Sequence, residues 1–179
     1  MNDIGALYHH QEEYEAALDY YFKAQKITEE LGLEKTGYYA STLNNIGVLY
    51  IDQEEYVMAL EYLFQTKKLK EDLGNAKTAS YAVTLNSIGV VYGNQEKNAD
   101  ALEYYFQSKK LIEDLGLTRI SLYAMILYNI GAVNVKKEKY CEAAEWAKKA
   151  VTIQEQIGVR SVRNHFEAAQ KKCAESKRR

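Results

Sequence analysis

Residues 43–84 read LNNIGVLYIDQEEYVMALEYLFQTKKLKEDLGNAKTASYAVT, and residues 85–126 read LNSIGVVYGNQEKNADALEYYFQSKKLIEDLGLTRISLYAMI. The two stretches are identical at 23 of 42 positions without a gap. The same period divides the chain into four repeats, residues 1–42, 43–84, 85–126 and 127–168. Such self-similarity predicts a linear array of one structural unit.

Each repeat predicts two helices. In the second repeat, apolar residues recur every three or four positions from Tyr39 to Tyr50, as one face of a helix requires. A polar break follows, and a second apolar stripe runs from Tyr56 to Leu69. Leu73 and Gly74 then close this helix, because glycine is common just past a helix end. The first helix of each repeat is called helix A here and the second helix B.

The predicted helix ends follow from these breaks. We expect helix A to end near Asp52 and Asn94, and helix B near Leu73 and Leu115. An acidic pair close to the end of helix B is slightly unfavourable with the helix dipole. We expect this pair to be solvated surface.

One glycine lies inside helix A of every repeat, and one alanine inside helix B. A glycine in a helix interior costs about 1 kcal/mol relative to alanine. Four glycines in register therefore indicate that the two helices approach closely at this point. The pairs are Gly5 and Ala17, Gly47 and Ala59, Gly89 and Ala101, and Gly131 and Ala143.

The repeat resembles the tetratricopeptide repeat. The matching positions of the second repeat are Leu43, Ile46, Gly47, Tyr50, Tyr56, Ala59, Leu63 and Thr66. The period of 42 and the missing closing proline are similar to the long repeats of kinesin light chains, spindle-orientation adaptors and bacterial signalling proteins. The resemblance implies an all-α fold: a right-handed α-solenoid of four helix-turn-helix units in a single domain, residues 1–179.

The two ends of the array differ from its middle. Residues from about 160 to 176 continue as a helix that aligns with a fifth helix A and is expected to cap the array. Its stripe holds Val162, Phe166, Ala169 and Cys173. The first helix A lacks its first half, which predicts a fragment of a longer array. We expect Leu18 and Tyr21 to lack their normal cover there. This N-terminal face is expected either to meet another chain, as in self-association, or to be covered by sequence upstream.

The composition argues against nucleic-acid and membrane partners. With 23 Lys and Arg against 25 Asp and Glu, the net charge is −2, and no apolar run approaches the length of a membrane span. No signal peptide is recognisable at the N-terminus. Cys141 and Cys173 lack a CxxC spacing, so we expect free thiols in a reducing, cytoplasmic compartment rather than a disulfide or a metal site.

The sequence offers no set of residues that converges for catalysis. Adjacent residues on a helix point about 100° apart, so His9 and His10 do not chelate one metal ion, and His165 is expected to belong to the cap. We therefore expect a protein that is not an enzyme and binds no cofactor.

In the resembled family, the inner face of helix A lines a concave groove that binds peptides. The residues expected there are Asn2, Ser41, Asn44, Val48, Asp52, Val83, Asn86, Val90, Asn94, Met125, Tyr128 and Lys136. An asparagine amide both donates and accepts, so it can pair with the main chain of a bound segment. The alternative is that these asparagines bond neighbouring repeats, a role also expected for Asn45 and Asn129.

Two functions fit these expectations. The first is a non-catalytic scaffold that binds a peptide or an extended protein segment in the groove. The second is a regulatory module of a larger signalling protein, such as a kinase, a cyclase or a transcription regulator. Lys136 is the one cation among the expected groove positions, which disfavours the carboxylate-binding groove of chaperone-binding relatives.

Overall fold

The computed structural model describes residues 1–158 and 163–177, except for the side chains of residues 163–166. The chain divides into two compact units, Met1–Lys77 and Thr78–Arg179. The described residues form helices and turns without any strand, which confirms the expected all-α fold.

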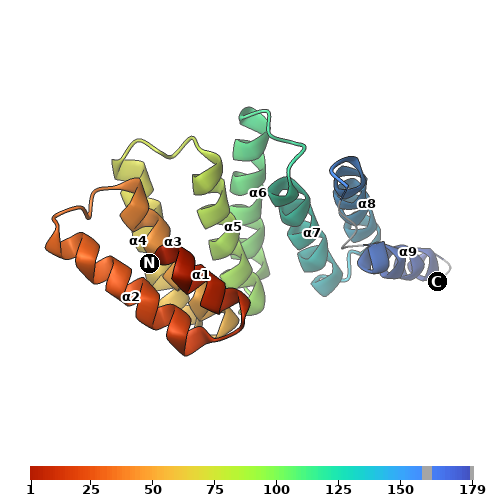
Figure 1. The fold of residues 1–179 in the computed structure, drawn as a ribbon. Coiled ribbons are helices and arrows are strands. Elements are labelled where there is room, and N and C mark those ends of the chain that lie inside the picture. Colours follow the sequence, from red (N-terminus) through yellow and green to blue (C-terminus); the bar gives the residue numbers. More distant parts are fainter. Residues whose placement is uncertain (159–162, 178–179) are drawn as a thin grey trace. The chain divides into compact units, whose positions relative to one another are not determined.

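Antiparallel helix pairs build both units (Figure 1). The N-terminal unit contains α1 (Asn2–His10), α2 (Tyr14–Glu30), α3 (Gly37–Asp52) and α4 (Tyr56–Asp72). The C-terminal unit contains α5 (Ala79–Asn94), α6 (Asn98–Asp114), α7 (Ser121–Lys136), α8 (Tyr140–Gln156) and α9 (Arg163–Ser176). The odd-numbered helices α1 to α7 are helices A, and α2 to α8 are helices B. Helix A ends at the two predicted residues, and helix B ends one residue before those predicted.

Local chemistry sets these boundaries. The hydroxyl oxygen of Thr36 accepts a hydrogen bond of 3.2 Å from the amide of Tyr39 and so caps α3; Thr78 caps α5 in the same way. Helix B of each repeat is followed by a glycine in the left-handed region, with φ between 66° and 77°. This conformation ends the helix at the position that the sequence predicts.

The glycine inside helix A makes room for a large side chain of helix B. A Cβ atom built on Gly89 would lie 2.7 Å from Cδ1 of Tyr105, and one built on Gly47 would lie 2.9 Å from Cγ of Leu63. The alanine expected to make this contact is only part of it, because the carbonyl oxygen of Ala101 lies 3.3 Å from the same point on Gly89. The residue one turn after the alanine is what excludes a side chain at the glycine.

The short first helix leaves different residues uncovered from those expected. The prediction for Tyr21 is wrong: this side chain is 1% exposed, because its ring packs against Gly5. Leu18 is half-buried. The exposed apolar residues are instead Ile4 at 43% and Leu7 at 57%. One repeat later, Ile46 and Leu49 are both fully buried.

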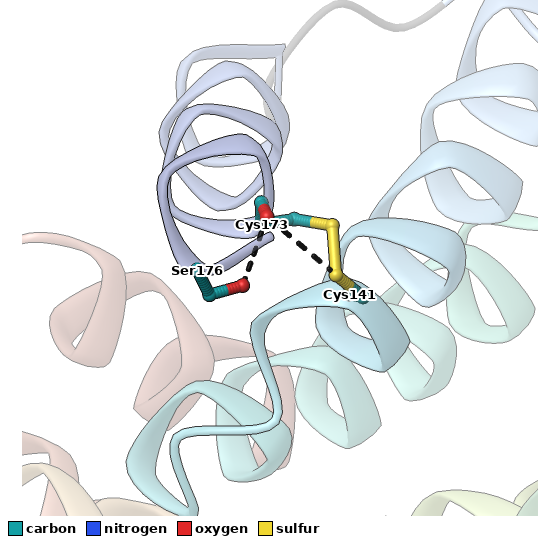
Figure 2. The surroundings of a disulfide bond; sticks show 3 residues. All are labelled: Cys141, Cys173 and Ser176. Atoms are coloured by element: carbon teal, nitrogen blue, oxygen red, sulfur yellow. Dashed lines mark hydrogen bonds between the residues drawn. A yellow bond between two sulfur atoms is a disulfide. The ribbon is translucent and has the colours of Figure 1, made fainter. Parts of the chain in front are cut away.

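The expectation of free thiols is also wrong. Cys141 of α8 and Cys173 of α9 form a disulfide, with their Cα atoms 4.7 Å apart (Figure 2). The predicted reducing compartment depended on free thiols, so the disulfide removes the basis for that prediction. Of the predicted cap residues, Ala169 is buried and Cys173 half-buried, whereas Val162 and the side chains of His165 and Phe166 lie outside the described residues.

Acidic residues at the end of helix B fasten the next helix A. The hydroxyl of Tyr39 donates to Glu29 at 2.6 Å, and the hydroxyl of Tyr123 donates to Glu113 at the same distance. Lys109 also bonds Glu113, at 2.7 Å. Burial raises the pKa of Glu113, but the bonds from Lys109 and Tyr123 outweigh burial and hold this pKa below its ordinary value. The acidic pair is therefore more than solvated surface.

The first prediction compares two glycines of the C-terminal unit. Gly89→Ala should destabilise the fold, since displacing the Tyr105 ring costs about 1–3 kcal/mol and exceeds the gain in helix propensity. Gly131→Ala should leave stability unchanged or raise it by up to about 1 kcal/mol. A Cβ atom built on Gly131 would lie no closer than 3.4 Å to a neighbouring atom, because Ala147 stands where the fold has Tyr105 one repeat earlier. Urea unfolding measures both, and equal losses in the two variants would contradict this account.

The second prediction concerns the tyrosine–glutamate bonds. Tyr39→Phe and Tyr123→Phe should each cost about 1 kcal/mol and lower the melting temperature by about 2–4 °C. Tyr38→Phe is the matched control in α3, because Tyr38 is 50% exposed and such surface changes stay within about 0.5 kcal/mol.

The pH dependence of this effect has a defined sign. The folded pKa of Glu113 is lowered, so its contribution is present above the ordinary value of 4.5 and is lost as the pH falls through the folded pKa. The difference in melting temperature between wild type and Tyr123→Phe should shrink on acidification below that value. A difference that stays constant down to acid unfolding would refute the role of the Glu113 carboxylate.

Candidate protein-binding surface

Neighbouring helices A pack side by side within each unit, α1 against α3 and α5 against α7. Toward helix B, α5 presents Ala82 and Gly89; the hydroxyl of Ser108 donates to the carbonyl of Ala82 at 2.7 Å. Val83 and Val90 each follow one of these contact residues by one position, which rotates them about 100° around α5. Val83 and Val90 therefore lie on a face of α5 that is turned about 100° away from these contacts with α6.

In the N-terminal unit, the structure brings the predicted residues together on α1 and α3. Ser41 and Asp52 are exposed, whereas Asn2, Asn44 and Val48 are half-buried. The side-chain amide of Asn2 donates to the hydroxyl oxygen of Thr42 at 2.8 Å. Asn2 therefore already joins two repeats.

In the C-terminal unit, the predicted residues lie on α5 and α7. Asn94 and Lys136 are exposed, and Met125 is 44% exposed. Val83, Val90 and Tyr128 are half-buried. These apolar side chains form a surface that is partly open to solvent on two adjacent helices.

Asn86 differs from this expectation. Only 3% of its side chain is exposed, and its Oδ1 accepts a hydrogen bond of 3.1 Å from the amide of Asn129. The expectation that Asn86 faces solvent is corrected, because the adjacent helix A covers it. Asn129 bonds the neighbouring repeat as expected, with Asn86 as its partner.

Two further bonds between adjacent helices A were not foreseen. Nε2 of His9 lies 2.6 Å from Oδ2 of Asp52, and Nζ of Lys136 donates to the carbonyl of Gly93 at 2.7 Å. Both pairs are separated by 43 residues, one more than the sequence period. A search at that separation would have found His9 opposite Asp52, a plausible pair. Lys136 bonds a main-chain carbonyl, so the sequence contains no partner side chain from which this bond could have been predicted.

The described residues were also searched for catalytic and metal chemistry. Within residues 1–158 and the described part of α9, no three His, Cys, Asp or Glu side chains converge to hold a metal ion. Nε2 of His9 is engaged by the carboxylate of Asp52. None of the helices in this part of the chain combines the length and apolar character that a membrane span needs.

An open depression lies between α7 and α8. Tyr123 and Leu127 form one side, and Lys149, Thr152 and Ile153 lie on the other. None of the twelve predicted site residues lines it. The depression is therefore separate from the face of helix A described above.

Comparison with known proteins agrees with the helical repeat fold. Residues 1–72 match the tetratricopeptide repeat family. A comparison with curated proteins gives no significant match.

Two solved structures share the fold. The crystal structure of BtubC (BKLC) from P. vanneervenii superposes with a TM-score of 0.77 at 20% identity, over 89% of this chain and 64% of that one. A Podospora anserina putative kinesin light chain with nearly identical TPR-like repeats superposes with a TM-score of 0.73 at 14% identity, over 97% of this chain and 82% of that one. The chain thus spans less than two-thirds of BtubC, and at these identities the likeness concerns the fold.

The 42-residue pattern, the family match over residues 1–72 and the shared repeat fold together make this chain similar to tetratricopeptide repeat proteins, among them a kinesin light chain.

Proposed function

We propose that this chain is a non-catalytic scaffold that binds an extended segment of a partner protein along the free face of its helices A. Tetratricopeptide repeats commonly serve protein–protein interaction. The observation that carries the proposal is the partly exposed apolar surface of Met125, Tyr128, Val83 and Val90. Val90 and Tyr128 also pack against the core, and partly exposed apolar side chains gathered on one surface are typical of a binding site.

The polar residues around this surface suit a main-chain ligand. Ser41 and Asn94 are exposed and Asn44 is half-buried, so hydroxyl and amide groups border the apolar positions. Packed helices lie roughly 8–10 Å apart, and an extended chain advances about 3.3 Å per residue. Each helix A would thus meet about every third residue of the segment. Each unit presents such positions by itself, so the proposal depends on no arrangement of the two units.

A protein partner fits the charge of this face better than a nucleic acid or an anionic membrane does. Lys136 is the one cation among the twelve site positions, and it already donates to the carbonyl of Gly93. Nucleic-acid affinity depends largely on Lys and Arg that neutralise phosphates. We therefore propose a peptide or extended protein ligand.

The third prediction tests the apolar positions. A library of random dodecapeptides displayed on phage is selected on the wild-type protein, and enriched peptides are titrated against the variants Val48→Glu and Val90→Glu. Both variants should reduce binding by at least about tenfold, since each places a charge on apolar surface. Val57→Glu is the matched control, because Val57 is 77% exposed and lies on helix B. Equal binding to all three variants would exclude this face as the site.

The asparagines refine the same experiment. Asn44→Ala should weaken binding by roughly 2- to 13-fold, the equivalent of one net hydrogen bond of about 0.5–1.5 kcal/mol. Asn86→Ala should instead lower the melting temperature, because it leaves the half-buried amide of Asn129 without its acceptor. A normal melting temperature together with weaker binding in Asn86→Ala would assign Asn86 to the ligand.

A second interaction is favoured by the exposed N-terminal surface. Ile4 and Leu7 are 43% and 57% exposed, although the equivalent Ile46 and Leu49 pack with Ala17 and Tyr21 in the core. We propose that this surface packs against the same surface of a second copy of the chain. A two-fold contact of this kind pairs the same apolar patch on both copies.

The fourth prediction follows from that contact. Wild-type protein should show concentration-dependent dimerisation in sedimentation velocity, and Leu7→Glu should make it monomeric by placing a charge in the contact. Val57→Glu again serves as the control and should dimerise like wild type. A wild-type protein that stays monomeric up to about 0.1 mM, well above a micromolar dissociation constant, would rule out this dimer.

A further inference from the structure

The last helix, α9, packs against α8, and few of its described side chains are buried. Among the described side chains of α9, only Ala169 is buried, and Cys173 is half-buried. Nζ of Lys172 lies 5.2 Å from the centre of the Tyr140 ring, and the other described side chains of this helix are exposed. The disulfide between Cys141 and Cys173 adds a covalent attachment of α9 to α8 (Figure 2).

The position of this attachment is unusual within the array. The residues equivalent to Cys141 in the first three repeats are Glu15, Val57 and Ala99, and all three are exposed. In the earlier repeats this part of helix B therefore faces solvent. By contrast, α9 covers it in the fourth repeat, so ordinary repeat packing does not demand α9 at this place.

We propose that Cys141 and Cys173 form a reversible thiol–disulfide site, and that a dithiol reductant releases α9 from α8 by reducing it. Both cysteines are half-buried, so a small dithiol has access to the sulfur atoms. The proposal concerns the C-terminal end of the array and does not depend on the binding face of helices A.

The helix ends indicate which sulfur is attacked. Cys141 is the second residue of α8, where the partial positive charge of the helix N-terminus stabilises a thiolate. Cys173 lies in the last turn of α9, where the partial charge is negative. The more stable thiolate leaves faster in thiol–disulfide exchange. The reductant is therefore expected to attack Sγ of Cys173.

The exchange balances in two steps. A thiolate of the dithiol forms a bond to Sγ of Cys173, and the bond between the two protein sulfurs breaks. Its electron pair leaves on Sγ of Cys141, which takes a proton from water. The second thiolate of the reductant then displaces Cys173, which is protonated in turn. The protein gains two electrons and two protons, and the dithiol becomes a disulfide.

The experiment measures amide hydrogen exchange in α9 with and without dithiothreitol. Cross-linking across a separation of 32 residues should protect the amides of residues 167–176 on the order of 100-fold more than the reduced form does. The amides of α5 and α6 serve as the internal reference and should not change. Alkylation with iodoacetamide should add no group to the oxidised protein and two groups to the reduced protein.

The variant Cys141→Ser/Cys173→Ser provides the control. Its α9 should exchange as fast as in reduced wild type and should not respond to dithiothreitol. Removal of dithiothreitol followed by oxidised dithiothreitol should restore protection in wild type. The proposal is overturned if α9 is equally protected in both redox states, if both thiols are alkylated in protein prepared without reductant, or if protection does not return on reoxidation.

Discussion

The close contact between the glycine of helix A and the large side chain of helix B sets how the two helices pack in the first three repeats. Because Tyr105 occupies the space where a Cβ atom of Gly89 would lie, α5 and α6 approach closely along one face of α5. That face is then unavailable to a ligand. What remains open is the face about a quarter turn away, which carries Val83 and Val90. The surface proposed for binding is thus a consequence of the packing that holds each repeat together.

The sequence predicted the helices well because one period aligned the same packing residues four times. It failed where a contact has no counterpart in the period. Cys141 and Cys173 form a bond that occurs once, between a repeat and a helix that covers surface exposed in the earlier repeats. Tyr21 was misjudged for a related reason. The helix α1 is shorter than the other helices A but still contains Gly5, so it keeps the contact that buries this ring.

The site was harder to predict than the fold, because a column of identical residues does not show what each side chain faces. Asn44 and Asn86 occupy the same column, yet Asn44 is half-buried and Asn86 is 3% exposed. Adjacent helices A place residues 43 apart opposite each other, as His9 and Asp52 show. Aligning the repeats at the period of 42 residues compares equivalent positions. The contacts between adjacent helices A instead join residues that are 43 apart. Comparing equivalent positions of the repeats therefore does not reveal which residue each side chain contacts.

Polar bonds fasten the repeat interfaces through contacts away from the proposed apolar surface. His9 with Asp52, and Lys136 with the carbonyl of Gly93, join neighbouring helices A. Tyr123 joins helix A to the carboxylate of Glu113 at the end of the preceding helix B. A carboxylate at that end is disfavoured by the helix dipole, and the bonds from the hydroxyl and from Lys109 offset this. Val90 is half-buried and packs against the core, so the proposed surface is continuous with the packing that stabilises the C-terminal unit.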